Sequence, residues 1–282
     1  MLETPAASPH LGRRAQRVED RPLLTGRGRF GDDAPVRAGT LHAAVLRSPH
    51  AHARLLAVRA DKAMALPGVR AVLTAADVQR WSKPFIVGVK APMELWALAV
   101  DKVRYVGEPV AVVVAESRYL AEDALELLEA DYESLPPVVD IRAAIAEGAP
   151  VLHEKVGSNV VSDRSFRYGD PEQAFASAPH RVALTVEYPR NSCTPIECAV
   201  VVAEFLCEDD GYDVQSNFMG PFSLHTVMAK ALKVQGNKLR HRTFPDSGGS
   251  FGVKQAVLNP AVLMCLAARK AGAPVKWVED RL

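Results

Sequence analysis

The segment Asp246–Lys254 has the residue types best suited to bind an anion. Three of its five central residues are glycines, Gly248, Gly249 and Gly252, and the segment lies between an expected strand and an expected helix. Glycine permits positive φ and close approach of a ligand to the backbone, and a helix N-terminus presents unpaired N–H groups. The pattern predicts a cradle for oxyanions or oxo ligands. A tight turn that needs glycine only for geometry explains it equally well. Neither a dinucleotide-binding glycine motif nor a Walker loop occurs here.

A second candidate segment, Asn191–Cys198, contains a carboxylate and a thiol. Glu197 follows Pro195 on the approach to a buried strand. It could act as a general base, but a structural carboxylate that holds the loop through backbone N–H bonds is favoured. Cys193 as a nucleophile would need a partner base, and the spacing of the histidines singles out none. His180, His225 and His241 are the histidines considered for that role.

The metal-ligating residue types are too sparse to predict a protein-held metal. His50 and His52 would share one face of a strand, but no third ligand is evident, so packing in a loop is favoured. Three of the four cysteines lie within fifteen residues without forming a Cys-x-x-Cys pair. Buried free thiols are therefore expected rather than a zinc site. The four are Cys193, Cys198, Cys207 and Cys265.

Strands and helices must position these residues, and the hydrophobic pattern predicts them in two groups. In the first group we expect an amphipathic helix capped by Ser117 and ended by Pro136-Pro137, and strands at 41–46, 69–73, 103–105, 110–115 and 138–139. In the second we expect helices at 221–232 and 255–271, and strands at 182–188, 199–206, 212–216, 238–244 and 274–278. Gly272 is placed to cap the last helix. This order of elements indicates the α+β class rather than a doubly wound sheet.

Composition bounds the function. The chain has 282 residues, 48% of them hydrophobic, which suffices for about two domains. With 34 basic and 33 acidic residues the formal net charge is +1, so nothing resembles the basic surface of a nucleic-acid-binding protein. No apolar run is long enough to span a membrane, and the N-terminus lacks the apolar core of a secretory signal. A cytoplasmic protein is expected.

Four segments, in this order, resemble the molybdopterin-binding large subunits of the xanthine dehydrogenase/aldehyde oxidase family. They are residues 21–30 with 47–53, residues 105–111 with 131–138, Pro195-Ile196-Glu197, and residues 248–254 with 274–277 and 280–281. The resemblance runs from about residue 20 to the end. It implies a tail over 1–20, an α/β hammerhead domain over 21–141, a linker over 142–180, and the first part of a molybdopterin-binding domain over 181–282.

The resemblance also implies which residues meet the cofactor. In the family, the backbone amides of a glycine–phenylalanine–glycine turn lie against the molybdenum oxo ligand, and a glutamine on the preceding strand approaches the metal's ligands. The cofactor-binding residues expected here are Asn217, Gly248, Gly249, Ser250, Phe251 and Gly252. Three positions depart from the family's pattern. Asn217 stands where the glutamine is usual, with Gln215 a weaker equivalent, Ser250 replaces a glycine, and Cys198 stands where proline is common.

Family members continue well beyond this length, and their catalytic base is a glutamate within a Gly-Glu-Gly context. No such tripeptide occurs here, so no catalytic residue is assigned, and the chain is expected to be inactive alone. The resemblance implies a molybdenum hydroxylase acting on an aldehyde or N-heteroaromatic C–H bond. Iron–sulfur and FAD subunits would take the electrons, and a further chain would complete the pterin site. Two alternatives stay open, a truncated or scaffolding relative and an unrelated anion-binding domain.

Overall fold

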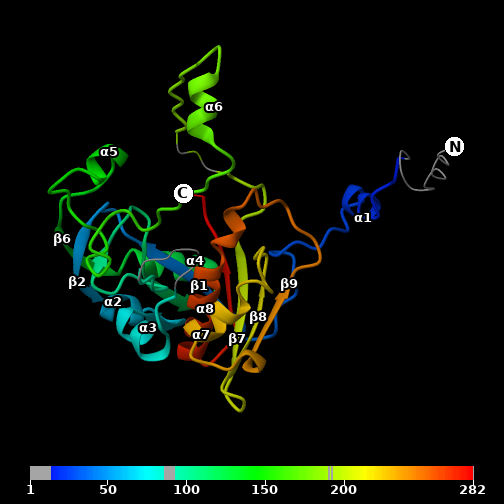
Figure 1. Ribbon diagram of the computed structural model, residues 1–282. Coiled ribbons are helices and arrows are strands. Elements are labelled where there is room, and N and C mark those ends of the chain that lie inside the picture. Colours follow the sequence, from blue (N-terminus) through cyan, green and yellow to red (C-terminus); the bar gives the residue numbers. More distant parts are fainter. Residues whose placement is uncertain (1–13, 86–92, 190, 192, 282) are drawn as a thin grey trace.

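The computed structural model describes residues 14–85, 93–189, 191 and 193–281. Its main body is one mixed sheet with helices on both faces (Figure 1). The strand order is β3 (Val69–Leu73), β5 (Pro109–Ala115), β1 (Leu41–Arg47), β10 (Val275–Val278), β7 (Val200–Leu206), β8 (Gly211–Ser216) and β9 (Leu239–Thr243). The pairs β1–β10 and β8–β9 are parallel and the others antiparallel. The predicted α+β class is confirmed.

A smaller antiparallel sheet contains β4 (Lys102–Val103), β2 (Ala53–Arg59) and β6 (Glu129–Ser134). The sequence pattern did not reveal β2, and it extended the helix after Ser117 too far. That helix ends at Leu125, and the chain from Glu129 pairs with β2 instead. Tertiary pairing thus overrides the helical pattern, because the strand packs Tyr132 against the small apolar cluster of this sheet. The strand expected at 138–139 is absent, since Val139 is exposed outside any strand.

Eight α-helices occur among the described residues, and those that contain buried residues form a layer on each face of the main sheet. The eight are α1 (Asp20–Leu24), α2 (Asp61–Met64), α3 (Ala75–Trp81), α4 (Arg118–Leu125), α5 (Ile141–Ala144), α6 (Pro171–Ser177), α7 (His225–Ala231) and α8 (Leu258–Ala271), with 3₁₀ turns η1 (Gly236–Lys238) and η2 (Val253–Gln255). Strand β5 shows why both layers are needed. Val112 and Val114 face the α8 cluster, whereas Ala111 and Val113 face α2 and α4. Both faces of β5 are therefore buried, as its unbroken apolar run predicts.

Several predicted boundaries are confirmed and two are corrected. The Ser117 hydroxyl accepts a hydrogen bond from the Leu120 amide and begins α4, and Gly272, at φ +64°, ends α8. Helix α7 begins at His225 rather than at Pro221, and α8 begins at Leu258 rather than at Gln255. In both cases turns occupy the intervening residues.

The two predicted domains contribute strands to one sheet. Leu41 of β1 pairs with Val275 of β10, which joins the 21–141 segment to the 181–282 segment. The boundaries at residues 141 and 180 stay predictions. The predicted tail lies largely outside the described residues.

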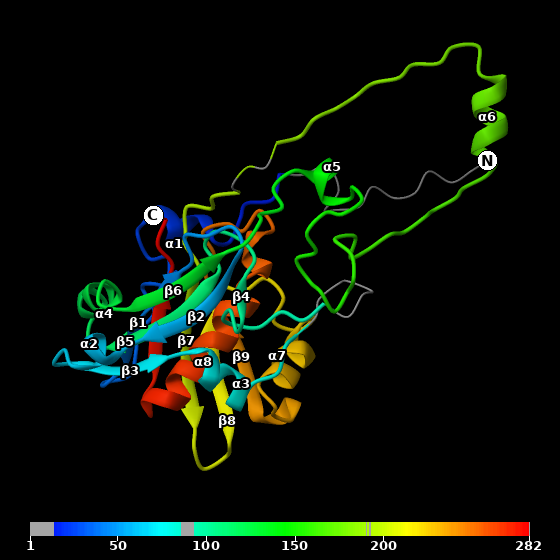
Figure 2. The same cartoon turned by 90° about the vertical axis from the view of Figure 1, so that its left-hand side faces the viewer.

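Residues 162–189, which we call the arm, leave this body. Figure 2 shows α6 at the end of a long excursion, away from both sheets. The strand expected at Val182–Tyr188 is absent, because these residues pair with no strand among the described residues. Asp170 caps α6 by accepting from the Gln173 amide, yet α6 has no buried residue.

Candidate functional site

The glycine-rich loop between β9 and η2 has an unusual backbone. Gly249 and Gly252 have φ of +98° and +91°, and Phe251 between them has φ of +50° although it has a side chain. A non-glycine residue in this region is strained and persists only where the surrounding structure holds it. The Phe251 ring is exposed, so the conformation is not imposed by burial of the ring.

This backbone leaves several amides available, those of Phe251 and Gly252 among them. The N–H groups of Phe251 and Gly252 donate to no acceptor in the part of the chain that the structure describes. A Cβ added at Gly252 would meet nothing within 4 Å, so the space beside that residue is open. Successive free N–H groups in a left-handed turn are a site for an anion or an oxo group. The residues present therefore fit the molybdenum cofactor that the sequence implies.

Gly248 is needed for a different reason. A Cβ at this position would lie 2.4 Å from Cβ of Glu197, which is closer than atoms can pack. The carbonyl of Gly248 accepts from the Glu197 amide at 3.4 Å, and the Gly248 amide donates to Oε2 of Glu197 at 2.8 Å. At Gly248, then, the turn explanation applies, because glycine lets the loop approach Glu197.

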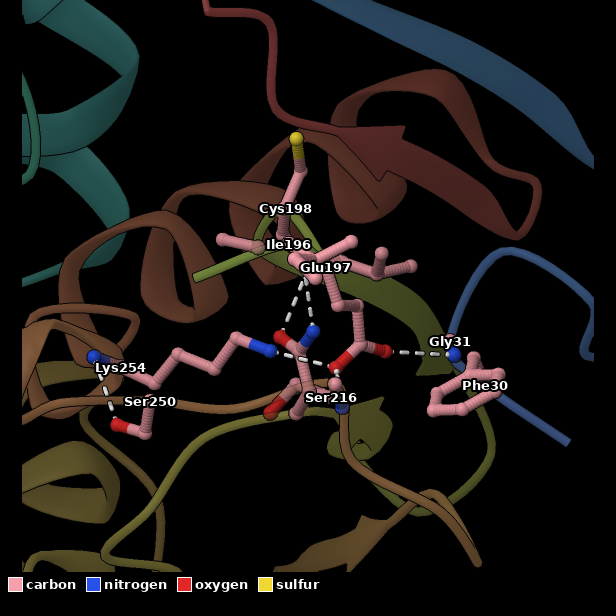
Figure 3. Close-up of polar contacts among 12 residues, drawn as sticks. Phe30, Gly31, Ile196, Glu197, Cys198, Ser216, Ser250 and Lys254 are labelled. Carbon is pink, nitrogen blue, oxygen red and sulfur yellow. Dashed lines mark hydrogen bonds and ion pairs between the residues drawn. The ribbon is translucent and has the colours of Figure 1, made fainter. Parts of the chain in front are cut away.

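Glu197 connects its own segment to the segment at Gly31 and to the segment that contains Gly248 and Lys254 (Figure 3). Its Oε1 accepts from the Gly31 amide at 2.9 Å, and its Oε2 accepts from the Gly248 amide and from Nζ of Lys254 at 2.5 Å. The side chains of Lys254 and Glu197 are only 2% and 10% exposed. The prediction that Glu197 holds the loop through backbone N–H bonds is confirmed.

The electrostatics of Glu197 argue against a general base. Burial alone would raise the pKa of its carboxyl group, but the hydrogen bonds from Lys254, Gly31 and Gly248 outweigh burial and lower the pKa. A carboxylate with a lowered pKa and both oxygens engaged is a poor proton acceptor near neutral pH. Its role is to neutralise Lys254 and fix the loop.

Ser250 stabilises the end of the loop. Its Oγ accepts from the Lys254 amide at 3.3 Å, and its carbonyl accepts from the Val253 amide at 3.1 Å. These bonds form the 3₁₀ turn η2, which separates Gly252 from the first residue of α8. The helix expected from Gln255 therefore begins three residues later, at Leu258, and does not direct its N-terminus at the glycines from Gln255. The loop's own amides must supply the positive potential.

Asn217 directly follows Ser216, the last residue of β8. Its Nδ2 donates to the Cys198 carbonyl at 2.8 Å, and its Oδ1 accepts from the Val200 amide at 2.9 Å. The side chain thus continues the β7–β8 ladder, with both of its polar atoms engaged. Contact between Asn217 and the cofactor stays a prediction that would require this arrangement to open. The sequence signal for the ladder role was the position of an Asn directly after a buried strand.

A cleft of about 750 Å³ borders the loop on the side of α8 and β10. Val253 and Lys254 of the turn η2 line this cleft, whereas the predicted glycines of the loop do not. Cys198, half-buried next to Glu197, lines the same cleft. Sequence reasoning missed Lys254 as a site residue. Its position in the first turn after a glycine-rich loop, on the same segment as the glycines, was the available signal.

Among the described residues, no hydrogen bond joins Cys193 to a histidine. His225 Nε2 contacts the Leu239 carbonyl, and His241 Nε2 contacts the Ser216 hydroxyl at 2.8 Å, so neither is aimed at the exposed Cys193. Burial lowers the pKa of His241 to about 4. All four cysteines are free. Only Cys265 is buried, so the expectation of buried thiols is wrong for the exposed pair Cys193 and Cys207 and for the half-buried Cys198.

His50 and His52 pack inside the first half of the chain. The His52 ring contacts the Pro136 carbonyl at 2.8 Å, and His50 lies against the Tyr132 ring at 4.7 Å. Within the described residues, no three His, Cys, Asp or Glu side chains are grouped to hold a metal. Across the same residues no helix is long and apolar enough to cross a bilayer.

Comparison with known proteins agrees with this architecture. Residues 25–136 match the family model of the aldehyde oxidase and xanthine dehydrogenase a/b hammerhead domain, and residues 152–282 match that of the molybdopterin cofactor-binding domain. The chain is similar to the nicotine 6-hydroxylase large subunit of Paenarthrobacter nicotinovorans, at 37% identity over 96% of this chain. It is also 35% identical, over 96% of its length, to the carbon monoxide dehydrogenase large chain of Afipia carboxidovorans.

The solved structure of quinoline 2-oxidoreductase from Pseudomonas putida 86 superposes with a TM-score of 0.86 at 37% identity. The match covers 96% of this chain and 34% of that chain, and the two curated relatives are covered over 33% and 35% of their length. This chain thus spans about a third of the proteins it resembles. It belongs to the xanthine dehydrogenase/aldehyde oxidase family of molybdenum oxidoreductases and corresponds to the N-terminal portion of their molybdopterin-binding large subunit.

Proposed function

We propose that this chain supplies the hammerhead domain and one wall of the cofactor pocket in a molybdenum hydroxylase. The substrate class is an aldehyde or an N-heteroaromatic compound, whose C–H bond gains oxygen derived from water. Iron–sulfur and FAD subunits take the electrons. The cofactor, when bound, supplies the two-electron redox chemistry.

The observation that carries the proposal is the pair of free amides at Phe251 and Gly252 in a left-handed turn. A preorganised pair of N–H donors can hold an anionic or oxo group without reorganising when charge develops there. Open space beside Gly252 leaves room for that group. The proposed cofactor contacts are therefore the backbone of Ser250, Phe251 and Gly252, with Gly248 and Gly249 shaping the turn.

Glu197 and Lys254 keep this turn in place rather than taking part in the reaction. Because the Glu197 carboxylate already neutralises the Lys254 ammonium at 2.5 Å, the lysine adds little net charge to the pocket. The attraction for an anion must come from the loop's backbone amides. The bond from the Gly248 amide to Glu197 fixes where the loop begins, and Ser250 fixes where it ends.

The general base lies, in this proposal, in the part of the relatives that this chain does not span. Within the described residues the best-placed carboxylate, Glu197, is committed to Lys254 and two backbone amides. Activity thus requires the polypeptide that completes the pterin site. A non-catalytic scaffold remains the alternative that the following experiment would reveal.

The test compares Gly252→Ala with Gly39→Ala after co-expression with the polypeptide encoded directly downstream. Both glycines have positive φ, +91° and +80°, and neither has an atom within 4 Å of an added Cβ, so the two variants carry similar strain. We expect Gly252→Ala to lower molybdenum, measured by elemental mass spectrometry, about tenfold. Gly39→Ala should retain it. Equal metal in both variants would contradict the cradle, and a metal-free wild-type complex would favour the scaffold.

A further inference from the structure

The end of the arm has the pattern of a β-strand without a sheet. In Val182–Tyr188 every second residue is apolar, and these four side chains are 75–90% exposed. They are Val182, Leu184, Val186 and Tyr188. The residues between them, Ala183, Thr185 and Glu187, form the opposite face. Alternation of large apolar side chains with small or polar ones is typical of a strand with one buried face, and this segment lacks that burial.

The backbone of the same segment is also unsatisfied. No backbone hydrogen bond joins Val182–Tyr188 to any other described residue. A strand that exposes its N–H and C=O groups together with an apolar face readily pairs with another sheet edge. Both the hydrogen-bonding capacity and the apolar side chains of the segment thus point to a missing neighbour.

The rest of the arm buries nothing either. Phe166, Tyr168 and Phe175 are exposed, and the seven-residue α6 has no buried residue. Figures 1 and 2 both show the arm projecting from the body. An isolated helix of this length is marginal in water, so the arm needs an outside surface to pack against.

The edge strand β9 of the chain's own main sheet does not offer that surface. The outer edge strand β9 exposes Arg240, Arg242 and Thr243, and the two arginines pair with Asp213. Packing a row of valine, leucine and tyrosine against these charged side chains would remove them from water without an apolar gain. None of the other edge strands, β3, β4 and β6, pairs with the segment either, so we look for its partner outside this chain.

We infer that Val182–Tyr188 is a docking strand that adds to an open sheet edge of the remaining two thirds of the large subunit. The arm lies within residues 152–282, which match the molybdopterin cofactor-binding domain, whereas the chain spans only 33–35% of its curated relatives. About two thirds of the length of these relatives therefore lies outside the part that this chain matches, and we take that part as the partner. The inference rests on the proposed function only for the source of this partner.

The partner's chemistry follows from the strand. Its edge must offer unpaired N–H and C=O groups in register with Val182–Tyr188. Its core-facing side must be apolar to receive Leu184 and Val186 at the centre of the strand and Tyr188 at its end. Thr185 and Glu187 would remain at the solvent face.

Hydrogen exchange read by mass spectrometry tests this. The full chain is measured alone and with the separately expressed polypeptide encoded directly downstream, the two being mixed without added molybdenum. In the free chain at low concentration, amides 183–188 should exchange as in an unstructured peptide. In the complex they should slow by at least about 100-fold, as expected for a paired strand.

Leu184→Asp and Thr185→Asp form a matched pair on opposite faces of the strand. We expect Leu184→Asp to raise the Kd at least about tenfold and Thr185→Asp to change it less than about threefold. Both side chains are exposed, so neither variant should lower the Tm of the free chain.

Protection in the free chain, whether within one copy or between two, would overturn the inference. So would equal effects of the two variants, an unprotected strand in the complex, or no complex at all. The outcome is separable from that of the molybdenum test. A complex that protects the strand but binds no metal would support the docking strand and overturn the proposed function. A metal-loaded complex with an unprotected strand would do the reverse.

Discussion

The segment around Glu197 and the arm that precedes it use similar residues to opposite effect. Both contain an acidic–basic pair, apolar side chains and a glycine with positive φ. In the site, Lys254 and Glu197 are buried and joined, and the neighbouring strand β7 packs on α8. In the arm, Arg167 and Glu172 pair in solvent, and Leu184 contacts no core. The contribution of a side chain to the free energy of unfolding should therefore depend on its burial rather than on its residue type. Paired substitutions in the two regions can test this.

The largest contrast is expected between the two ion pairs. Lys254→Met leaves the Glu197 carboxylate buried without its cation, which should lower the free energy of unfolding by about 3–5 kcal/mol. Arg167→Met, at an exposed pair, should change it by less than about 0.5 kcal/mol. Urea denaturation of both variants measures the difference, and similar losses would break the comparison.

Truncating one leucine in each region should give the next largest contrast. Leu266 in α8 is fully buried, so Leu266→Ala should cost about 3 kcal/mol through lost burial and a cavity. Leu184→Ala in the free chain should cost less than about 0.5 kcal/mol, because Leu184 is exposed. A measurable loss for Leu184→Ala in the monomer would mean that the arm packs on the body.

The pH dependence of stability sharpens the same contrast at the core. Burial lowers the pKa of His241 to about 4, so the folded state favours the neutral ring. The preference for a neutral His241 therefore contributes fully to the free energy of unfolding above the unfolded pKa of about 6.5. As the pH falls from there to about 4, the free energy of unfolding should decrease by about 2–3 kcal/mol. His241→Gln should flatten the stability curve in this window. A wild-type curve already flat there would contradict the assignment.

Two glycines give the smallest expected contrast. Gly248→Ala places a Cβ 2.4 Å from Glu197 Cβ and should destabilise by about 2 kcal/mol through overpacking. Gly169→Ala, in the arm, has open space around it and only a positive φ of +65° to strain, so about 1 kcal/mol is expected. Thermal unfolding of both variants distinguishes a steric requirement from a conformational one.

Much of the body could be predicted because its elements carry local signals. The apolar run of β5, the Ser117 cap of α4 and the Gly272 cap of α8 each specify an element from adjacent residues. The three glycines of the loop likewise predicted its unusual backbone conformation. Strands β2 and β6 were missed because their identity depends on pairing with each other rather than on their own pattern.

The unusual backbone of the site could be predicted, but the side-chain contacts that hold it in place could not. The sequence indicated a loop that could hold an anion and favoured a structural Glu197. It could not show that Lys254, 57 positions away, pairs with Glu197. Nor could it show that the Asn217 side-chain amide bonds to the backbone of β7 and extends the β7–β8 ladder. These contacts join residues that only the folded sheet brings together.

The alternating segments Val182–Tyr188 and β8 show what the sequence alone can and cannot predict. By itself the sequence determined that both segments can form strands with one apolar face. Tertiary structure decided that β8 has neighbours on both sides, β7 and β9, whereas Val182–Tyr188 has none within the described residues. The reason is physical. Strand propensity is local, but the hydrogen bonds and buried area that stabilise a strand belong to a partner distant in the chain or outside it.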